Sequence, residues 1–171
     1  SVENLRNHKP WGPFRGGKYS SFEAGTRVPF IVHWPGKVDT GVSNALVSQI
    51  DMLGTFAELT GIEVEKEQLK DSQPQLKTWL GKDKKGRDYV IGASSSLSIL
   101  TDEWKYIEPS QGAVYHQLTN TETGNNKEDQ LYNIRTDRSE YDNVADDNQL
   151  VVRFLKQIID DEKSKGVGMD L

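Results

Sequence analysis

The residues best suited to chemistry in this sequence are two cations on a glycine-rich turn. Arg15 and Lys18 flank Gly16 and Gly17, and a further glycine, Gly25, follows shortly afterwards. Because glycine has no Cβ, the backbone here can adopt turns and close approaches that other residues resist. A guanidinium and an ammonium on such a turn can converge on one oxyanion, such as a phosphate or sulfate group. On spacing alone, a solvated turn remains the commoner outcome.

The distribution of charge favours a small anion as the ligand of this turn. The chain has 171 residues and a formal net charge of −5. Residues 1–37 contain six Lys or Arg against two Glu, a net charge of +4, which leaves −9 for the remainder. Nucleic-acid backbones usually require a broad basic face, so we expect no nucleic acid as a partner. We also expect no membrane span, because no apolar run approaches the roughly 20 residues that cross a bilayer.

The composition restricts the nucleophiles and metal ligands that the chain can supply. Cysteine is absent, which excludes a disulfide framework, a thiolate nucleophile and a cysteine-ligated metal. The three histidines, at positions 8, 33 and 116, are too scattered to suggest a histidine-based site. We therefore predict no metal site within this chain, and nothing in its residues indicates a compartment.

The element that follows the turn is the apolar run Val28 to Trp34. It shows no alternation, as expected of a strand that is covered on both faces, and Pro29 and Pro35 exclude a helix of useful length. Its β-branched and aromatic residues suit a pleated surface. We therefore expect a buried strand here, with His33 as a hydrogen-bonded core residue.

An amphipathic helix is expected after this strand. Apolar residues recur at three- and four-residue steps from Val47 to Ala57, and Gly61 suits a left-handed C-cap. Ser48 and Asp51 have the spacing of a capping box. We interpret Asp51 as a first-turn charge that complements the helix dipole.

These patterns divide the chain into three parts. Residues 1–61 have the order of an α/β edge unit, and residues 62–87 read as a connection with a short helix around positions 74–80. In residues 88–171, short strand-like runs alternate with polar turns, one of them long, at 119–129. This predicts an α+β subdomain with a small antiparallel sheet of about four strands. A last helix is expected to cover the sheet with its apolar stripe of Leu150, Val151, Phe154, Leu155, Ile158 and Ile159.

Several short motifs occur in an order that resembles the sulfatase family, in its arylsulfatase-like branch. They are Gly17-Lys18, Phe22-Glu23-Ala24-Gly25, Arg27-Val28-Pro29-Phe30, Trp34-Pro35-Gly36, Val47 to Asp51, and Thr55 to Gly61. A later pattern is similar to the C-terminal subdomain of that family: Trp104-Lys105-Tyr106, Gln130 to Asn133, Asp137, Glu140 and Asn143-Val144. The one departure is that the usual Glu-Gly-Gly occurs here as Glu23-Ala24-Gly25.

The resemblance implies the fold and chemistry of a larger parent enzyme in the alkaline-phosphatase-like superfamily, of which this chain is a truncated C-terminal portion. Such enzymes hydrolyse sulfate esters with a formylglycine, made from cysteine or serine, that attacks sulfur beside a bound calcium ion. The motif C/S-x-P-x-R of the modified residue does not occur here, and neither do the acidic calcium ligands. We therefore expect both upstream, and expect this chain alone to be inactive. A periplasmic or secreted parent would agree with the resemblance.

By the same resemblance, Lys18 corresponds to the sulfate-binding lysine of the family. Its ammonium would stabilise charge on the oxygens of a sulfated sugar or aryl sulfate in the transition state. Arg15, His8 and Trp11 are further candidates for substrate binding, the histidine through a hydrogen bond and the tryptophan through ring stacking. Each is open to a structural role, and Arg15 could pair with Glu23. For Glu23 with Arg27, we favour a structural ion pair that holds the loop.

Two other functions remain open at this point. A phosphoester or phosphonate hydrolase on the same superfamily scaffold would use a similar loop, and a non-catalytic carbohydrate-binding or interaction module would bind sugar by itself. If the run Val28 to Trp34 belongs in a sheet whose other strands lie upstream, its edges are unpaired here. We then expect self-association of the chain, or disorder of residues 1–40.

Overall fold

The computed structural model describes residues 10–165, and their contacts divide the chain into two compact units. One unit combines the chain up to Val28 with Ile91–Asp161. The other combines Pro29–Val90 with the chain from Glu162 onwards. The loop that carries Lys18 therefore belongs with the C-terminal sheet, rather than with the helix that follows it in sequence. The boundaries predicted at 61 and 87 stay a prediction about the domains of a longer protein.

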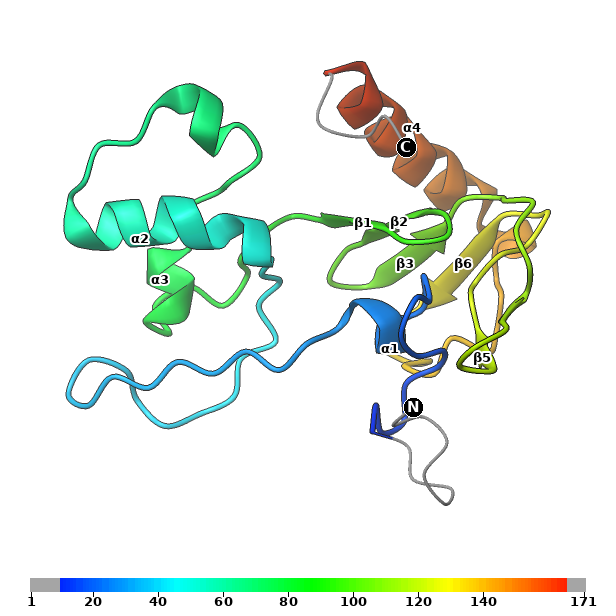
Figure 1. Ribbon diagram of the computed structural model, residues 1–171, viewed down its shortest axis with the longest axis horizontal. Coiled ribbons are helices and arrows are strands. Elements are labelled where there is room, and N and C mark those ends of the chain that lie inside the picture. Colours follow the sequence, from blue (N-terminus) through cyan, green and yellow to red (C-terminus); the bar gives the residue numbers. More distant parts are fainter. Residues whose placement is uncertain (1–9, 166–171) are drawn as a thin grey trace. The chain divides into compact units, whose positions relative to one another are not determined.

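The first unit is built on a four-stranded sheet (Figure 1). The strands lie in the order β1 (Val90–Ala93), β2 (Leu97–Leu100), β3 (Trp104–Ile107) and β6 (Gln130–Asn133). Strand β3 pairs antiparallel with both β2 and β6. The predicted antiparallel sheet of about four strands is confirmed, and it lies within residues 88–171, where the short strand-like runs occur.

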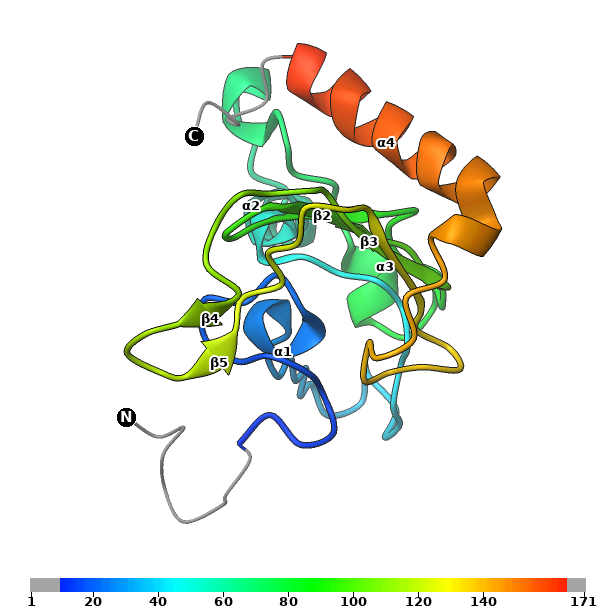
Figure 2. The ribbon, with the colours of Figure 1, turned by 90° about the vertical axis from the view of Figure 1, so that its right-hand side faces the viewer.

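Different segments cover the two faces of this sheet (Figures 1 and 2). Successive residues of a strand point to opposite faces, so Tyr106 and Lys105 of β3 face different neighbours. The Tyr106 hydroxyl donates to Asp129, which also accepts from Lys156 of α4 (Gln149–Ser164). On the other face, Lys105 reaches Glu23 of the short helix α1 (Glu23–Thr26). The Lys18 loop thus packs on the sheet through α1.

The predicted last helix is confirmed, but its buried stripe differs from the expected one. Helix α4, which follows the 3-10 turn η4 (Asp146–Asn148), buries Val152, Leu155 and Ile159. Leu150 and Phe154, which the predicted stripe included, are 76% and 64% exposed. A helix that lies on four short strands buries only a narrow line of side chains at i, i+3 and i+7, so the wider apolar stripe is only partly used.

A second, two-stranded sheet lies beside α1 in the first unit (Figure 2). It pairs β4 (Tyr115–His116) with β5 (Thr121–Glu122) in an antiparallel arrangement. Strand β5 falls within residues 119–129, which we had expected to be a long polar turn. Such short polar strands lack the apolar alternation that would reveal them. Backbone bonding joins this region to the Lys18 loop, because the N–H of Ser21 donates to the carbonyl of Thr123 at 2.8 Å.

The second unit is helical and confirms several local predictions. Helix α2 (Met52–Thr60) follows the 3-10 turn η2 (Gln49–Asp51), and the capping box of Ser48 and Asp51 is present. Gly61 ends α2 with a φ of 70°, the left-handed conformation expected of it. A further 3-10 turn, η3 (Lys66–Leu69), precedes the predicted short helix α3 (Leu76–Trp79), which packs against α2. Within residues 10–165, none of the helices combines the length and apolar character needed to cross a bilayer.

The run Val28 to Trp34 is not a strand in this structure, so the predicted buried strand is wrong here. Val28 is 56% exposed, Ile31 86% and Trp34 40%. His33 is also exposed, and is not the hydrogen-bonded core residue that we expected. A strand needs neighbours for its N–H and C=O groups. In the described part of the chain, no segment pairs with this run.

Candidate functional site

The turn that carries Lys18 is folded tightly, and glycine makes this possible. The N–H of Ser20 donates to the carbonyl of Gly17 at 3.0 Å. Gly16 has a φ of 84°, in the left-handed region that favours glycine. A Cβ at Gly25 would lie 2.1 Å from the carbonyl oxygen of Ser20, closer than any real contact. The predicted need for glycine on both sides of Lys18 is therefore confirmed.

The Lys18 side chain is exposed and is available to an external anion. Within residues 10–165 it makes no hydrogen bond and no ion pair, and its Nζ lies 4.9 Å from the ring centroid of Tyr19. Tyr19 has a φ of 74°, which is unusual for a residue with a Cβ. Its half-exposed ring stacks on His116 with 4.7 Å between the ring centroids. The ammonium thus stands beside an aromatic surface on a backbone of defined shape.

Arg15, the second cation of the turn, is committed to contacts within the protein. Its Nε and Nη2 donate to the two carboxylate oxygens of Glu122 at 2.8 and 2.7 Å, and its Nη1 donates to the carbonyl of Glu140 at 2.5 Å. The hydrogen bonds with Glu122 raise the pKa of Arg15 and lower the pKa of Glu122. The pairing of Arg15 with Glu23 that we had considered does not form. These contacts make Arg15 an anchor of the loop.

Of the two aromatic candidates before the turn, the structure describes one. Trp11 is half-buried, and a Cβ at Gly17 would lie 3.5 Å from its ring, so the ring borders the Lys18 loop. His8 lies outside the described residues. Stacking of a sugar ring on Trp11, a hydrogen bond from His8 and a substrate contact by Arg15 all stay predictions.

A group of buried charges lies between the loop and the sheet. The carboxylate of Glu23 accepts from Lys105 Nζ at 3.2 Å and from Arg27 Nε at 2.8 Å, which confirms the predicted ion pair of Glu23 with Arg27. Burial alone would raise the pKa of Glu23, but the charges of Lys105 and Arg27 outweigh burial and hold that pKa below its ordinary value. We had not predicted the role of Lys105. Its charge in the otherwise apolar strand Trp104–Ile107 was the signal that could have revealed it.

Glu140 completes this group and is fully buried. Its Oε2 accepts the backbone N–H of Glu23 at 2.7 Å, whereas its Oε1 has no hydrogen-bond partner among the described residues. Burial raises the pKa of Glu140 to about 7, and the neighbouring ammonium of Lys105 only partly offsets this. Sequence reasoning had not singled out Glu140 as a functional residue.

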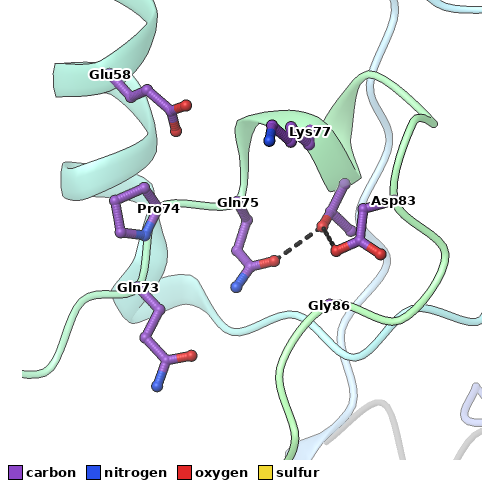
Figure 3. Close-up of a pocket in the computed structure, with 8 residues that line it drawn as sticks. Glu58, Gln73, Pro74, Gln75, Lys77, Asp83 and Gly86 are labelled. Carbon is purple, nitrogen blue, oxygen red and sulfur yellow. Dashed lines mark hydrogen bonds between the residues drawn. The ribbon is translucent and has the colours of Figure 1, made fainter.

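The second unit contains an open hollow of about 510 Å³ between α2 and α3 (Figure 3). Its lining is mostly polar, and several of the polar groups satisfy one another. Thr78 Oγ1 donates to Gln75 Oε1 at 2.9 Å and to Asp83 Oδ2 at 3.3 Å. The hollow also presents the charged side chains of Glu58 and Lys77, but its charges are of both signs, so it offers no net positive site for an oxyanion. The Lys18 loop is therefore the better candidate.

Comparisons with known proteins identify sulfatases as the proteins that this chain resembles, in agreement with the family that the motifs around the Lys18 loop suggest. A family model described as Sulfatase matches residues 5–62. An N-acetylgalactosamine-6-O-sulfatase from Bacteroides thetaiotaomicron is 42% identical over 167 residues, which cover 96% of this chain and 33% of that protein. The chain thus spans about a third of the length of this relative.

Two solved structures are similar along most of the chain. One, from work on the metabolism of multiple glycosaminoglycans by Bacteroides thetaiotaomicron, has a TM-score of 0.89 at 42% identity and covers 95% of this chain and 34% of its own. The other, Ps i-CgsB in complex with k-i-k-neocarrahexaose, has a TM-score of 0.67 at 26% identity and covers 85% of this chain and 30% of its own. The fold is therefore shared over both the Lys18 loop and the sheet on which it packs.

Proposed function

Since the chain belongs to the sulfatase family and corresponds to its C-terminal portion, we propose that it is part of an enzyme that hydrolyses sulfate esters of carbohydrates. The relatives support this class of substrate, because the similar proteins include an N-acetylgalactosamine-6-O-sulfatase and one that was solved with k-i-k-neocarrahexaose. We propose N-acetylgalactosamine 6-sulfate as the first substrate to test, with an aryl sulfate as a general reporter.

The exposed ammonium of Lys18 on its tight glycine turn is the observation that carries this proposal. Lys18 would bind the sulfate oxygens of the substrate and would stabilise the negative charge that grows on them as the ester bond breaks. Because Lys18 forms no ion pair within residues 10–165, it loses none there when an anion arrives. A backbone that is already folded needs little reorganisation at that moment.

The nucleophile and the metal of the proposed reaction would come from the rest of the parent protein. Among residues 10–165, no three His, Asp or Glu side chains are grouped so that they could hold a metal ion. We propose that the calcium ligands and the formylglycine precede this chain in the parent. This chain alone would then turn over no sulfate ester.

The test is the rate of sulfate release by the complete parent enzyme and its Lys18→Ala variant. We expect kcat/KM to fall far more than tenfold, because the lost charge acts mainly in the transition state. Lys18→Arg should recover only part of the rate, since a planar guanidinium does not match the position of the ammonium. Near-normal activity of Lys18→Ala would refute the role of Lys18.

The same assays separate the alternatives that the sequence left open. Preferential release of phosphate over sulfate by the parent would favour a phosphoester or phosphonate hydrolase. Measurable affinity of this chain alone for a sulfated oligosaccharide, unaffected by Lys18→Ala, would favour a carbohydrate-binding module. Sulfate release by this chain alone would contradict its proposed inactivity.

A further inference from the structure

The turn at residues 137–142 forms three hydrogen bonds with the segment that carries Lys18. Ser139 Oγ donates to the carbonyl of Pro13 at 3.0 Å. The carbonyl of Glu140 accepts from Arg15 Nη1 at 2.5 Å, and the Glu140 carboxylate accepts the backbone N–H of Glu23 at 2.7 Å. These three contacts bracket Lys18 in sequence, because Arg15 precedes it and Glu23 follows it. The loop ends are therefore held by one short segment more than 100 residues further along the chain.

The turn at residues 137–142 is itself stabilised by internal hydrogen bonds. The carboxylate of Asp137 accepts the backbone N–H groups of Ser139, Tyr141 and Asp142 at 3.2, 2.8 and 2.9 Å. Glu140, in the middle, has a φ of 54°, a conformation that a residue with a Cβ adopts at some cost. Because the backbone of this turn is held in one conformation, it can also hold the Lys18 loop in one position.

The buried carboxylate of Glu140 lowers the stability of the folded state. It is fully buried, its Oε1 lacks a hydrogen-bond partner in the described part of the chain, and Glu23 adds a second carboxylate nearby. Lys105 and Arg15 are the cations that face it, from β3 and from the loop, and Lys105 already bonds Glu23. Removing the solvent from a carboxylate without full pairing destabilises the folded state.

We propose that Glu140 is a positioning residue that holds the backbone around Lys18, so that the Lys18 ammonium stands where a sulfate ester needs it. The inference rests on the proposed function, since it assigns a means of positioning to the same lysine. Glu140 touches no substrate in this role. Its carboxylate fixes the backbone N–H of Glu23, while its main-chain carbonyl binds Arg15, and together these contacts hold the turn between.

The experiment compares Glu140→Ala, Glu140→Gln and Asp129→Asn in the complete enzyme. Glu140→Ala removes the acceptor of the Glu23 N–H, and we expect kcat to fall about tenfold or more with a smaller change in KM, because misplacement of a charge-stabilising group acts on the transition state. Glu140→Gln keeps an acceptor oxygen and should restore most of that loss. Asp129→Asn is the matched control, because Asp129 braces α4 on the opposite face of the sheet. Asp129→Asn should lower the melting temperature but should leave kcat unchanged.

Two further readouts separate positioning from a general loss of stability. In a Lys18→Ala background, Glu140→Ala should cost little further activity, because its effect acts through Lys18. Amide hydrogen exchange at Glu23 should accelerate in Glu140→Ala but not in Asp129→Asn. Additive losses, or an unchanged kcat in a folded Glu140→Ala enzyme, would overturn the positioning role while the role of Lys18 stands. Near-normal activity of Lys18→Ala would instead refute the proposed function itself.

Discussion

Arg87 and Asp51 form a bidentate ion pair in the interior of the second unit. Arg87 Nε donates to Asp51 Oδ2 at 2.7 Å and its Nη2 to Oδ1 at 2.5 Å, and both side chains are buried. Asp51 also accepts the N–H groups of Ser48 and Gln73. Its main role is therefore to tie the start of α2 to the connection that follows. Our interpretation of Asp51 as a simple dipole-complementing charge was incomplete.

We predict that Asp51→Ala destabilises the second unit by about 3–5 kcal/mol, because it leaves the guanidinium of Arg87 buried without its partner. Asp88→Ala is the control, since Asp88 and Lys85 form an ion pair in which both side chains are 74% exposed. That pair should contribute about 1 kcal/mol or less. Thermal and urea unfolding would check both values, and equal effects of the two substitutions would contradict the prediction.

Gly25→Ala should disrupt the Lys18 loop. The new Cβ would lie 2.1 Å from the carbonyl oxygen of Ser20 and 2.7 Å from that of Gly17, and both are backbone atoms that cannot rotate away. We expect a loss of stability on the order of that caused by overpacking a core, about 1–3 kcal/mol or more. Gly41→Ala, where nothing lies within 4 Å of a Cβ, should stay close to the parent chain. Melting temperatures of the two variants would measure the difference.

The stability of the chain should fall as pH rises from 4.5 to 7 on account of Glu140. Its pKa is about 7 in the folded chain against an ordinary 4.5, so the folded state binds the proton more strongly and loses this advantage as the carboxyl ionises. The slope is at most about 1.4 kcal/mol per pH unit. Glu23, whose pKa is lowered, contributes stability that is lost only below this window. Glu140→Gln should flatten the curve of melting temperature between pH 5 and 8, and an unchanged slope would refute the assignment.

The chain by itself should self-associate through the exposed run Val28 to Trp34. Its apolar side chains are open to solvent, and no described segment pairs with its backbone. Such an unpaired extended run is a template for contact with another copy. Ile31→Asp should reduce association, whereas Leu118→Asp, at another residue that is 82% exposed, should not. Light scattering after size exclusion would test this, and a monomer at all concentrations would contradict it.

Local features were predictable from the sequence because neighbouring residues encode them. The capping box at Ser48, the left-handed Gly61, the strands of the four-stranded sheet and the glycine requirement around Lys18 depend on short-range sterics and on side-chain periodicity. The role that we propose for Lys18 came from the family resemblance, because neither composition nor spacing could supply it. The run Val28 to Trp34 shows the limit of such prediction. An apolar pattern indicates that a segment suits a strand, but it does not indicate which other segment pairs with it.

What the tertiary structure decided is which distant charges meet. Lys105 joins Glu23 across 82 residues, Arg15 turns to Glu122 across 107, and Glu140 holds Glu23 across 117. No local pattern marks such pairs, because each depends on the path of the chain and on which face of the sheet a side chain occupies. The sequence by itself therefore determined the Lys18 turn and the family to which it belongs. Only the fold determined what holds that turn in place, since buried charges are stabilised by partners that long-range packing brings together.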